Sequence, residues 1–185
     1  MKTTVWSKQH SNVLELLNDS GRYVAKKAHI YSELQEHSEY ILEAYDWYVR
    51  RVSLKYPKPD DVSYPVWVSL SLKNAMIPSE NTVTLEMEID DCIIMPVNIN
   101  KWSMILNYAY IPKDEEDAQR HRLLLKQYGV SDAKAYMSSF YPQIKKEIVA
   151  SWDRLFDEGV AINNNRMQYG TVWELRKEWI VNVVR

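Results

Sequence analysis

Two side chains near the end of the chain, Glu174 and Gln168, could carry chemistry. Glu174 lies between Trp173 and Leu175 in a segment that alternates like a β-strand. A carboxylate with apolar neighbours must reach solvent, a cleft or a cationic partner, because burying a charge without one is costly. The amide of Gln168 can form up to four hydrogen bonds, which is enough to orient a ribose or an amide. These two residues are the first candidates for a catalytic site.

A second candidate is the carboxylate pair Asp90-Asp91, which ends an alternating run that begins at Thr82. Paired carboxylates can bind a divalent cation or hold one proton between them. Neighbouring residues in a strand point to opposite faces, however, so the two need not share a site. We favour the interpretation that this is a turn with exposed aspartates.

Most standard motifs are missing. The chain has four glycines and neither GxGxxG nor GxxxxGK[ST], so no phosphate cradle of these types is expected. It has no HExxH, GxSxG or zinc-type Cys–His spacing, and no metal is expected. Cys92, the one cysteine, excludes an internal disulfide; its apolar neighbours predict a buried, inert thiol. The histidines lie in polar surroundings on or beside expected helices, which predicts solvated imidazoles at His10, His29, His37 and His121.

The composition of the 185 residues is that of a globular protein, with 46% apolar and 26% charged residues. A net charge of −2 gives no electrostatic case for a nucleic-acid or anionic-membrane partner. No stretch approaches the roughly 20 apolar residues of a membrane span, and the first residues lack the apolar core of a signal peptide. These observations predict a cytoplasmic protein. Seven tryptophans and thirteen tyrosines indicate a wide aromatic core or a cleft lined with stacking faces.

Two alternating runs are expected to organise a sheet that positions these side chains. In 83–94, the apolar residues first alternate with carboxylates, so one face is predicted to be buried and the other polar. The run 65–73 has the same period of two, and the loop between the runs suggests antiparallel neighbours. Three more strands are expected at 3–8, 171–175 and 180–184.

Helices are expected around this sheet. A short helix should run from Ser11 to Gly21, followed by a return strand at 23–25, and a longer helix from Ser32 to about Leu54. Residues 114–158 form a helical block, read as a packed layer, a lid or a partner surface, in which Pro142 either interrupts a helix or begins one. The sequence therefore predicts a single α+β domain, 1–185. It should be a twisted, mainly antiparallel sheet with flanking helices and a helical insertion before the last two strands.

Strings along nearly the whole chain resemble a bacterial family known as domain of unknown function 3841. They are TVWSKQ, LLNDSGRYVA, EAYDWYVRRV, YPVWVSLSL, VTLEMEIDD, KWSMILN and MQYGTVWELRKEWIVNVV. The matching features are Trp6, Gly21, Tyr23, Tyr45, Trp47, Pro65, Trp67, Trp102, Gln168 and Trp173. The helical block matches least distinctly. The resemblance implies one continuous fold and brings no activity with it.

The order of elements at both ends of the chain is also similar to that of ADP-ribosyltransferase-like domains. In that family a glutamate near the last strands binds the nicotinamide ribose and stabilises an oxocarbenium-like transition state, and an aromatic side chain stacks on the nicotinamide. This likeness implies NAD as the cofactor and Glu174 or Gln168 in the place of that carboxylate. No arginine or histidine of the first strand is placed as those enzymes require. The candidate cofactor-binding residues are Trp6, Tyr23, Tyr45, Trp67 and Trp173.

Two classes of function are therefore expected. As an enzyme, the chain would use NAD to modify a macromolecule or a small molecule, with Glu174 polarising the ribose and Gln168 orienting it. As a non-enzymatic module, it would bind a protein partner through exposed aromatic residues and the helices of 114–158. Such a module would belong to a bacterial or phage defence, counter-defence or toxin system.

Overall fold

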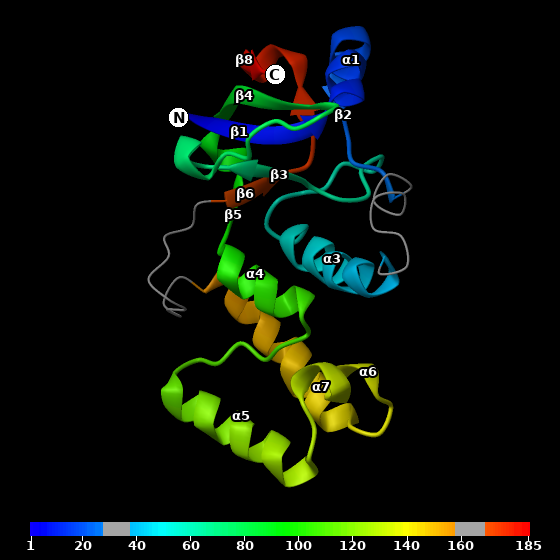
Figure 1. The fold of residues 1–185 in the computed structure, drawn as a ribbon, viewed down its shortest axis with the longest axis vertical. Coiled ribbons are helices and arrows are strands. Elements are labelled where there is room, and N and C mark those ends of the chain that lie inside the picture. Colours follow the sequence, from blue (N-terminus) through cyan, green and yellow to red (C-terminus); the bar gives the residue numbers. More distant parts are fainter. Residues whose placement is uncertain (28–37, 158–168) are drawn as a thin grey trace. The chain divides into compact units, whose positions relative to one another are not determined.

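The computed structural model describes residues 1–27, 38–157 and 169–185. The chain forms two compact units (Figure 1): a sheet unit, Met1–Val97 with Met167–Arg185, and a helical unit, Asn98–Arg166. A largely antiparallel sheet and segregated helices confirm the predicted α+β class. The helical unit contains the predicted helical block and begins before it. The assignment of the whole chain to a single domain stays a prediction.

The sheet unit is built on a six-stranded antiparallel sheet with the strand order β5-β6-β3-β1-β4-β8 (Figure 1). Its two long strands, β1 (Lys2–His10) and β4 (Thr82–Asp90), pair along their whole length, from Lys2 opposite Asp90 to His10 opposite Thr82. The shorter strands are β3 (Val66–Ser69), β5 (Met95–Val97), β6 (Tyr169–Val172) and β8 (Ile180–Val184).

One face of this sheet is the buried face that the alternation in β4 predicts. Val83, Leu85, Met87 and Ile89 are all buried, whereas Glu88, between the last two, is exposed. Helix α1 (Ser11–Ser20) covers this face with buried Val13 and Leu17. α1 ends at Gly21, whose φ of 74° lies in the left-handed region that glycine adopts without strain.

A second, two-stranded sheet joins segments that are far apart in the sequence. β2 (Arg22–Tyr23) pairs with β7 (Leu175–Arg176), so Arg22 lies opposite Arg176 and Tyr23 opposite Leu175. The 3-10 turn η5 (Lys177–Trp179) then leads into β8. This small sheet is where the first candidate carboxylate is positioned.

The longest helix of the sheet unit, α3 (Ser38–Val52), is linked to the opposite face of the main sheet. Its Tyr48 hydroxyl is 2.7 Å from Oγ1 of Thr171 in β6. Thr171 lies opposite Trp67 and next to Val172, which belongs to the α1-covered core. Because neighbouring residues of a strand alternate between faces, Thr171 and α3 lie on the face away from that core.

Gly170 shows how closely β5, β6 and the core approach one another. A Cβ atom at this position would lie 2.8 Å from Cγ2 of Ile94 and 3.1 Å from the carbonyl oxygen of Met95. Both separations are below van der Waals contact, and the carbonyl belongs to a paired strand that cannot easily move. Gly170 is therefore required by packing rather than by its backbone conformation.

The strand arrangement corrects three predictions. The runs expected to be neighbours, β3 and β4, do not pair with each other, because β1 lies between them and pairs with both. The predicted strand 83–94 also ends at Asp90: the 3-10 turn η3 (Asp91–Ile93) follows, and β5 then pairs with β6. The 65–73 run likewise ends as a strand at Ser69, before the 3-10 turn η2 (Leu72–Asn74).

The helical unit contains four helices within its described residues: α4 (Ile99–Leu106), α5 (Glu115–Tyr128), α6 (Asp132–Met137) and α7 (Pro142–Ser151), which continues into the 3-10 turn η4 (Trp152–Phe156). Local signals set their ends. The Asp114 carboxylate accepts from the Asp117 amide to begin α5, and Gly129, at φ 65°, ends it. Pro142 begins α7 rather than interrupting a helix.

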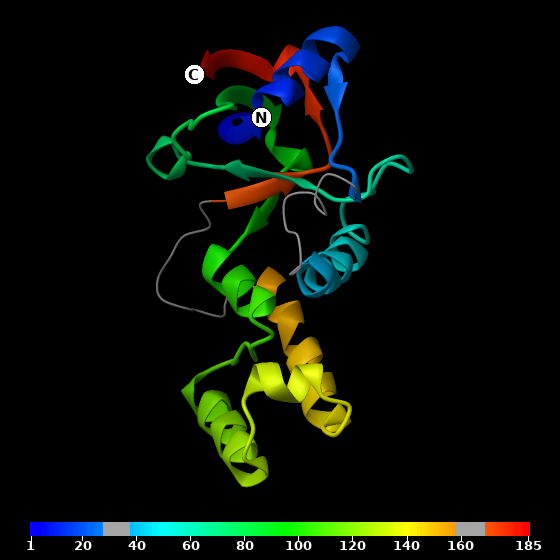
Figure 2. The same ribbon diagram turned by 45° about the vertical axis from the view of Figure 1, so that its right-hand side comes forward.

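A stack of aromatic rings forms the centre of the helical unit. The ring of Tyr136 lies 4.2 Å from that of Tyr108 and 5.5 Å from that of Trp152, with interplanar angles of 9° and 23°. The Trp152 indole is 1% exposed, and its Nε1–H donates to the carbonyl of Ala109 at 3.0 Å. These contacts join α6, η4 and the segment after α4, and α6 packs against α7 in both ribbon views (Figures 1 and 2).

Two predictions about single side chains are wrong. Cys92 is exposed, because the turn η3 directs it away from the apolar run on which its burial was predicted. His121 is 3% exposed in α5 rather than solvated. His10 is exposed as predicted, and it accepts from the amide of Asn12 at the start of α1.

The predictions for His29 and His37, and the start of the helix expected from Ser32, lie outside the described residues. Among the helices that are described, none combines the length and the apolar character needed to cross a membrane.

Candidate functional site

Glu174 lies between β6 and β7, where two guanidinium groups hold its carboxylate. Nε of Arg22, in β2, donates to Oε2 of Glu174, and Nε of Arg176, in β7, donates to Oε1 at 2.6 Å. Arg22 also donates to both carboxylate oxygens of Asp61, at 2.5 and 3.1 Å. The Glu174 side chain is only 13% exposed. Glu174 thus ties the two strands of the small sheet together.

These contacts set the charge of the carboxylate. Burial raises the pKa of Glu174, but hydrogen bonds and charges from Arg22 and Arg176 outweigh it, and the pKa lies below its ordinary value. Hydrogen bonds to Asp61 and Glu174 raise the pKa of Arg22 in turn. Glu174 is therefore ionised at neutral pH with both oxygens occupied. To stabilise a developing positive charge on a substrate, it would have to release a guanidinium group.

Replacing Glu174 with glutamine is expected to lower the free energy of unfolding by about 1–2 kcal/mol at neutral pH, because two charge-assisted hydrogen bonds lose their charge. The sign with pH follows from the lowered pKa. The stabilisation is present above the unfolded pKa, near 4.5, and is lost as the pH falls through the folded value. Urea unfolding at several pH values measures both effects.

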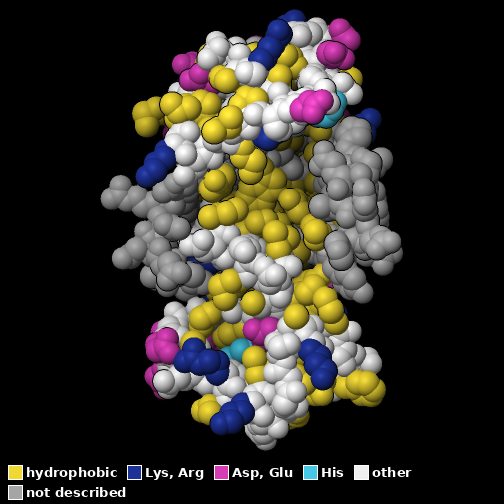
Figure 3. All heavy atoms as spheres, in the orientation of Figure 1, with side chains coloured by type: hydrophobic (Ala, Val, Ile, Leu, Met, Phe, Trp, Pro, Cys, Tyr) yellow, Lys and Arg dark blue, Asp and Glu magenta, His cyan; other side chains and the backbone are white. Residues whose placement is uncertain are grey.

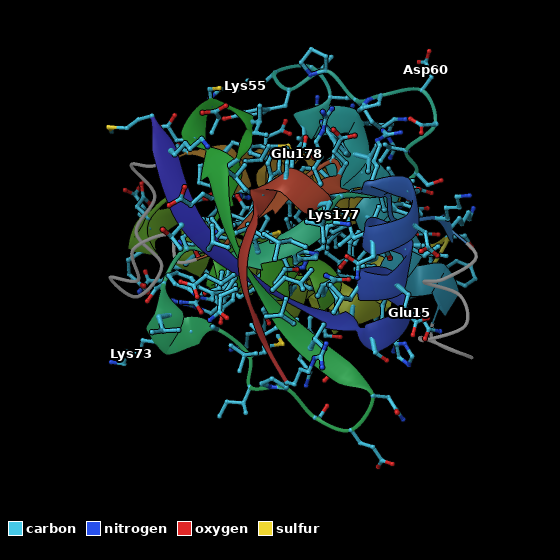
Figure 4. The ribbon with its side chains drawn as sticks, turned by 90° about the horizontal axis from the view of Figure 1, so that it is seen from above. Glu15, Lys55, Asp60, Lys73, Lys177 and Glu178 are labelled. Carbon is cyan, nitrogen blue, oxygen red and sulfur yellow. The ribbon has the colours of Figure 1, made fainter. Side chains whose placement is uncertain are left out.

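Glu178→Gln is the matched control for this variant. Glu178, at the surface in η5 (Figure 4), also contacts Arg176, but at 3.6 Å and with 63% of its side chain exposed. This variant should change the stability by less than about 0.5 kcal/mol. An equal loss in both variants would show that Glu174 does not hold the small sheet together.

Two of the predicted stacking residues lie together on the α3 face of the sheet. Nε1 of Trp67, in β3, donates to the hydroxyl of Tyr45, in α3, at 2.9 Å. The ring of Tyr48 is stacked over Trp67 at 6.4 Å, and the ring of Tyr64 meets Tyr45 edge-on at 5.8 Å. Trp67 and Tyr45 are half-buried. They pack against other aromatic residues and their polar atoms bond to one another, as in an aromatic core.

The remaining predicted residues lie elsewhere in the sheet unit. Tyr23 packs against the core that α1 covers, whereas Trp6, next to buried Val5 in β1, points to the opposite face. Trp173 is 8% exposed, and its Nε1 donates to the carbonyl of Tyr56 at 3.0 Å. Tyr23 and Trp6 thus do not form one stacking wall. The prediction for Gln168 lies outside the described residues.

The helical unit contains a buried ion cluster that the sequence analysis did not predict. His121, in α5, lies between two carboxylates: its Nε2 is 2.7 Å from Asp132 in α6, and its Nδ1 is 3.0 Å from Glu147 in α7. An ionised carboxylate can only accept, so both ring nitrogens must donate and the ring is an imidazolium. The ring of Tyr110 stacks on it at 3.9 Å. His121 therefore joins three helices through charge.

The charges in this cluster support one another. Burial lowers the pKa of His121, but hydrogen bonds to Asp132 and Glu147 outweigh it, so the pKa is raised from 6.5. Burial raises the pKa of Glu147, but Arg120 and His121 lower it by more, so the pKa lies below its ordinary value. Arg120 donates to Glu147 at 2.6 Å and to the hydroxyl of Tyr110 at 3.0 Å. Charged side chains that are all paired in this way hold packed elements in one arrangement. His121 with Asp132, Glu147 and Arg120 is termed the His121 clamp below.

Asp117 extends the cluster towards the N-terminus of α5. Its carboxylate accepts from the Tyr110 hydroxyl at 2.8 and 2.9 Å and from the Lys113 amide at 2.9 Å, and Arg154 approaches it to 3.2 Å. Burial raises the pKa of Asp117, but these contacts and Arg120 lower it more, to about 2. Asp117 is therefore ionised at any physiological pH and fixed in place.

A buried lysine closes the other end of the helical unit. Lys101, in α4, is 1% exposed, and its Nζ donates to the carbonyls of Arg154 and Asp157 at 2.6 Å each. Burial lowers its pKa. These carbonyls lie at the end of η4, where backbone acceptors have no partner within the helix, so Lys101 serves as a C-terminal cap.

Apolar side chains are exposed at the end of α5, at the end of α6 and in the loop before α7. Phe140, in the loop before α7, is 85% exposed, and Met137 and Tyr128 are 56% and 53% exposed. The ring of Tyr128 meets that of half-buried Tyr141 edge-on at 6.2 Å, which joins the end of α5 to the start of α7. These four residues are termed the apolar cluster below. Large apolar side chains that gather on a surface mark interaction sites more often than single ones do.

Among the described residues, no group of three or more histidine, cysteine or acidic side chains is arranged to hold a metal ion. No curated protein and no solved structure shows significant similarity to the chain. One family model does match, over residues 4–181, and its description is Domain of unknown function (DUF3841). The match spans both units, in line with the strings quoted above. The chain therefore belongs to the DUF3841 family.

Proposed function

We propose that this chain is a protein-binding module and that its contact surface is the apolar cluster of the helical unit. The observation that carries the proposal is the exposure of Phe140. It is one of two phenylalanines in the chain, it is 85% exposed, and it follows exposed Met137 by three residues in the sequence. Aromatic and methionine side chains are enriched at the centres of protein interfaces, where a few of them carry most of the binding energy.

The scaffold beneath the cluster supports this proposal. The His121 clamp and the aromatic stack around Trp152 fix α5, α6 and α7 against one another. A surface that is fixed before binding loses little conformational entropy when a partner arrives, so more of the contact energy appears as affinity. A partner from a defence, counter-defence or toxin system would have to bind this same surface.

The contacts of Glu174 make the NAD-dependent function the second candidate. The observation in its favour is that Glu174 is ionised and fixed in position, as a carboxylate that faces an oxocarbenium-like centre would need to be. Against it, Arg22 and Arg176 already neutralise this charge, and the predicted stacking residues Trp6 and Tyr23 point to opposite faces. Tryptophan quenching by millimolar NAD that is lost in Glu174→Gln would favour the enzyme.

The binding proposal is tested with Phe140→Ser. The tagged wild-type chain is used to capture a partner, the partner is purified, and its Kd is measured for wild type and variant. We expect Phe140→Ser to weaken binding about tenfold or more, because an interface anchor contributes at least about 1.4 kcal/mol.

Leu54→Ser provides the matched control for this experiment. Leu54 is 81% exposed and belongs to the sheet unit, so this variant removes a similarly exposed apolar side chain that is not part of the apolar cluster. The proposal expects Leu54→Ser to bind like wild type. Equal affinities for all three chains, or a loss confined to Leu54→Ser, would contradict it.

A further inference from the structure

We propose that the partner of the apolar cluster presents an acidic segment with apolar anchor residues. This inference rests on the proposed function and adds the chemistry of the partner. It is argued from the charges that surround the cluster, and from those that are already engaged within the helical unit.

Lysines accompany each part of the apolar cluster. Exposed Lys126 lies in the last turn of α5 with Tyr128, although a spacing of two places them on different sides of the helix, and Lys134 is one helical turn before Met137 in α6. Lys145 follows Tyr141 by four residues, so it lies on the same side of α7, where its Nζ is 4.2 Å from the centre of the Tyr136 ring. Exposed Lys146 is next to it.

The acidic side chains nearby are engaged with other partners. Between Ala118 and Ser151, six lysines and arginines stand against two acidic residues, Asp132 and Glu147. Both of these contact His121, and Glu147 also accepts from Arg120. Arg120 and Arg122 are also paired with acidic side chains, so the positive charge around the cluster comes from the four lysines, although the whole chain carries −2.

The remaining acidic residues of α5 lie at its other end. Asp114, Glu115, Glu116 and Asp117 form the start of a helix of 14 residues, roughly 20 Å from Tyr128 at the rise of an α-helix. This distance exceeds the screening length of about 8 Å at physiological salt. In Figure 3, acidic side chains lie along one edge of the helical unit and also near its centre beside a histidine, whereas basic ones lie across the rest of that face and beside exposed hydrophobic ones.

A narrow acidic segment fits this pattern better than a broad anionic surface does. Glutamates or aspartates of such a segment would meet the lysines, and its apolar residues would cover Phe140 and Met137. A broad anionic surface would also meet the acidic first turn of α5 and be repelled there. Complementary charges at the rim of an interface raise the association rate and suppress wrong partners.

The experiment uses the protein captured through Phe140 and, separately, vesicles of phosphatidylserine and phosphatidylcholine. The test variant combines Lys126→Glu, Lys134→Glu and Lys146→Glu. The control is Lys73→Glu, an exposed lysine of the sheet unit (Figure 4). The triple variant should bind the captured protein about tenfold or more weakly at low salt, mainly through slower association, and with a shallower salt dependence. Lys73→Glu should leave the affinity and its salt dependence unchanged.

The possible outcomes distinguish a wrong partner chemistry from a wrong protein-binding function. Phe140-dependent capture with no effect of the triple variant would overturn the acidic partner and leave the protein-binding function standing. Phe140- and lysine-dependent binding to the vesicles in place of a protein would assign the surface to an anionic membrane and overturn the inference. Absence of any Phe140-dependent partner would overturn both.

Discussion

Replacing Trp152 with alanine is expected to lower the free energy of unfolding of the helical unit by about 3–5 kcal/mol. The indole is 1% exposed and stacks on Tyr136, so its removal leaves a large cavity beside α6. It also leaves the carbonyl of Ala109 without the indole donor at 3.0 Å. Because α6 leads directly to Met137 and Phe140, the same variant should weaken partner binding.

Trp152→Phe separates the contribution of the stacked ring from that of the indole hydrogen bond. It keeps a ring to stack on Tyr136 but removes the indole donor, so it should cost less than half of the alanine substitution. Denaturant unfolding gives the total loss, and amide hydrogen exchange assigns it to the helical unit. A loss of less than about 1 kcal/mol in Trp152→Ala would show that the stack does not stabilise this unit.

Replacing His121 with leucine is the second large effect, with an expected loss of about 2–4 kcal/mol. It leaves Asp132 and Glu147 without the cation that lies between them, and removing one partner of a buried ionic group costs more than the group contributes. The expected loss of stability is smaller than for a fully buried group, because the two carboxylates are 22% and 30% exposed. Tyr110 stacks on the same ring, and Arg120 donates to Glu147.

The His121 clamp also predicts how stability depends on pH. A histidine whose folded pKa is raised contributes stability fully below its unfolded pKa, near 6.5, and loses it as the pH rises through the folded value. The helical unit of the wild-type chain should therefore become less stable as the pH rises above about 6.5. His121→Leu should lack this slope, which urea unfolding across that pH range would detect.

A multiple variant tests whether uncompensated charge causes the loss. Adding Asp132→Asn and Glu147→Gln to His121→Leu removes the repulsion between the carboxylates, so part of the stability should return. If the triple variant is less stable than His121→Leu alone, the carboxylates stabilise the unit through contacts other than the histidine. The proposed clamp would then be wrong.

Periodicity predicted the parts of the fold that depend on local sequence. The alternation of Val83, Leu85, Met87 and Ile89 correctly identified the buried face of β4, because a strand has a strict period of two. The end of α1 at Gly21 was also identified correctly, since its left-handed conformation depends on the adjacent backbone. Contacts between residues distant in sequence were harder to predict. The position of β1 between β3 and β4, for example, depends on the whole sheet.

The candidate site was predicted in part, for a similar reason. Of the three environments expected for Glu174, solvent, a cleft or a cationic partner, the structure shows the cationic partner; one such partner, Arg22, lies 152 positions away and no spacing indicates it. His121 was missed although a signal existed. It shares a helix face with Asp117, Leu124 and Leu125 at spacings of three and four, which places it towards the interior. Polar neighbours in sequence suggested solvent instead.

The central claim is that the chain acts through the apolar cluster and not through the carboxylate of Glu174. Its most direct test places a photoreactive phenylalanine analogue at position 140, with a second chain labelled at position 54, and analyses the adducts formed on irradiation in cells. We expect one discrete protein adduct from position 140 and none from position 54. The adduct from position 140 should be unchanged when Glu174→Gln is added. An adduct from position 54 alone, or one from position 140 that disappears with Glu174→Gln, would contradict it.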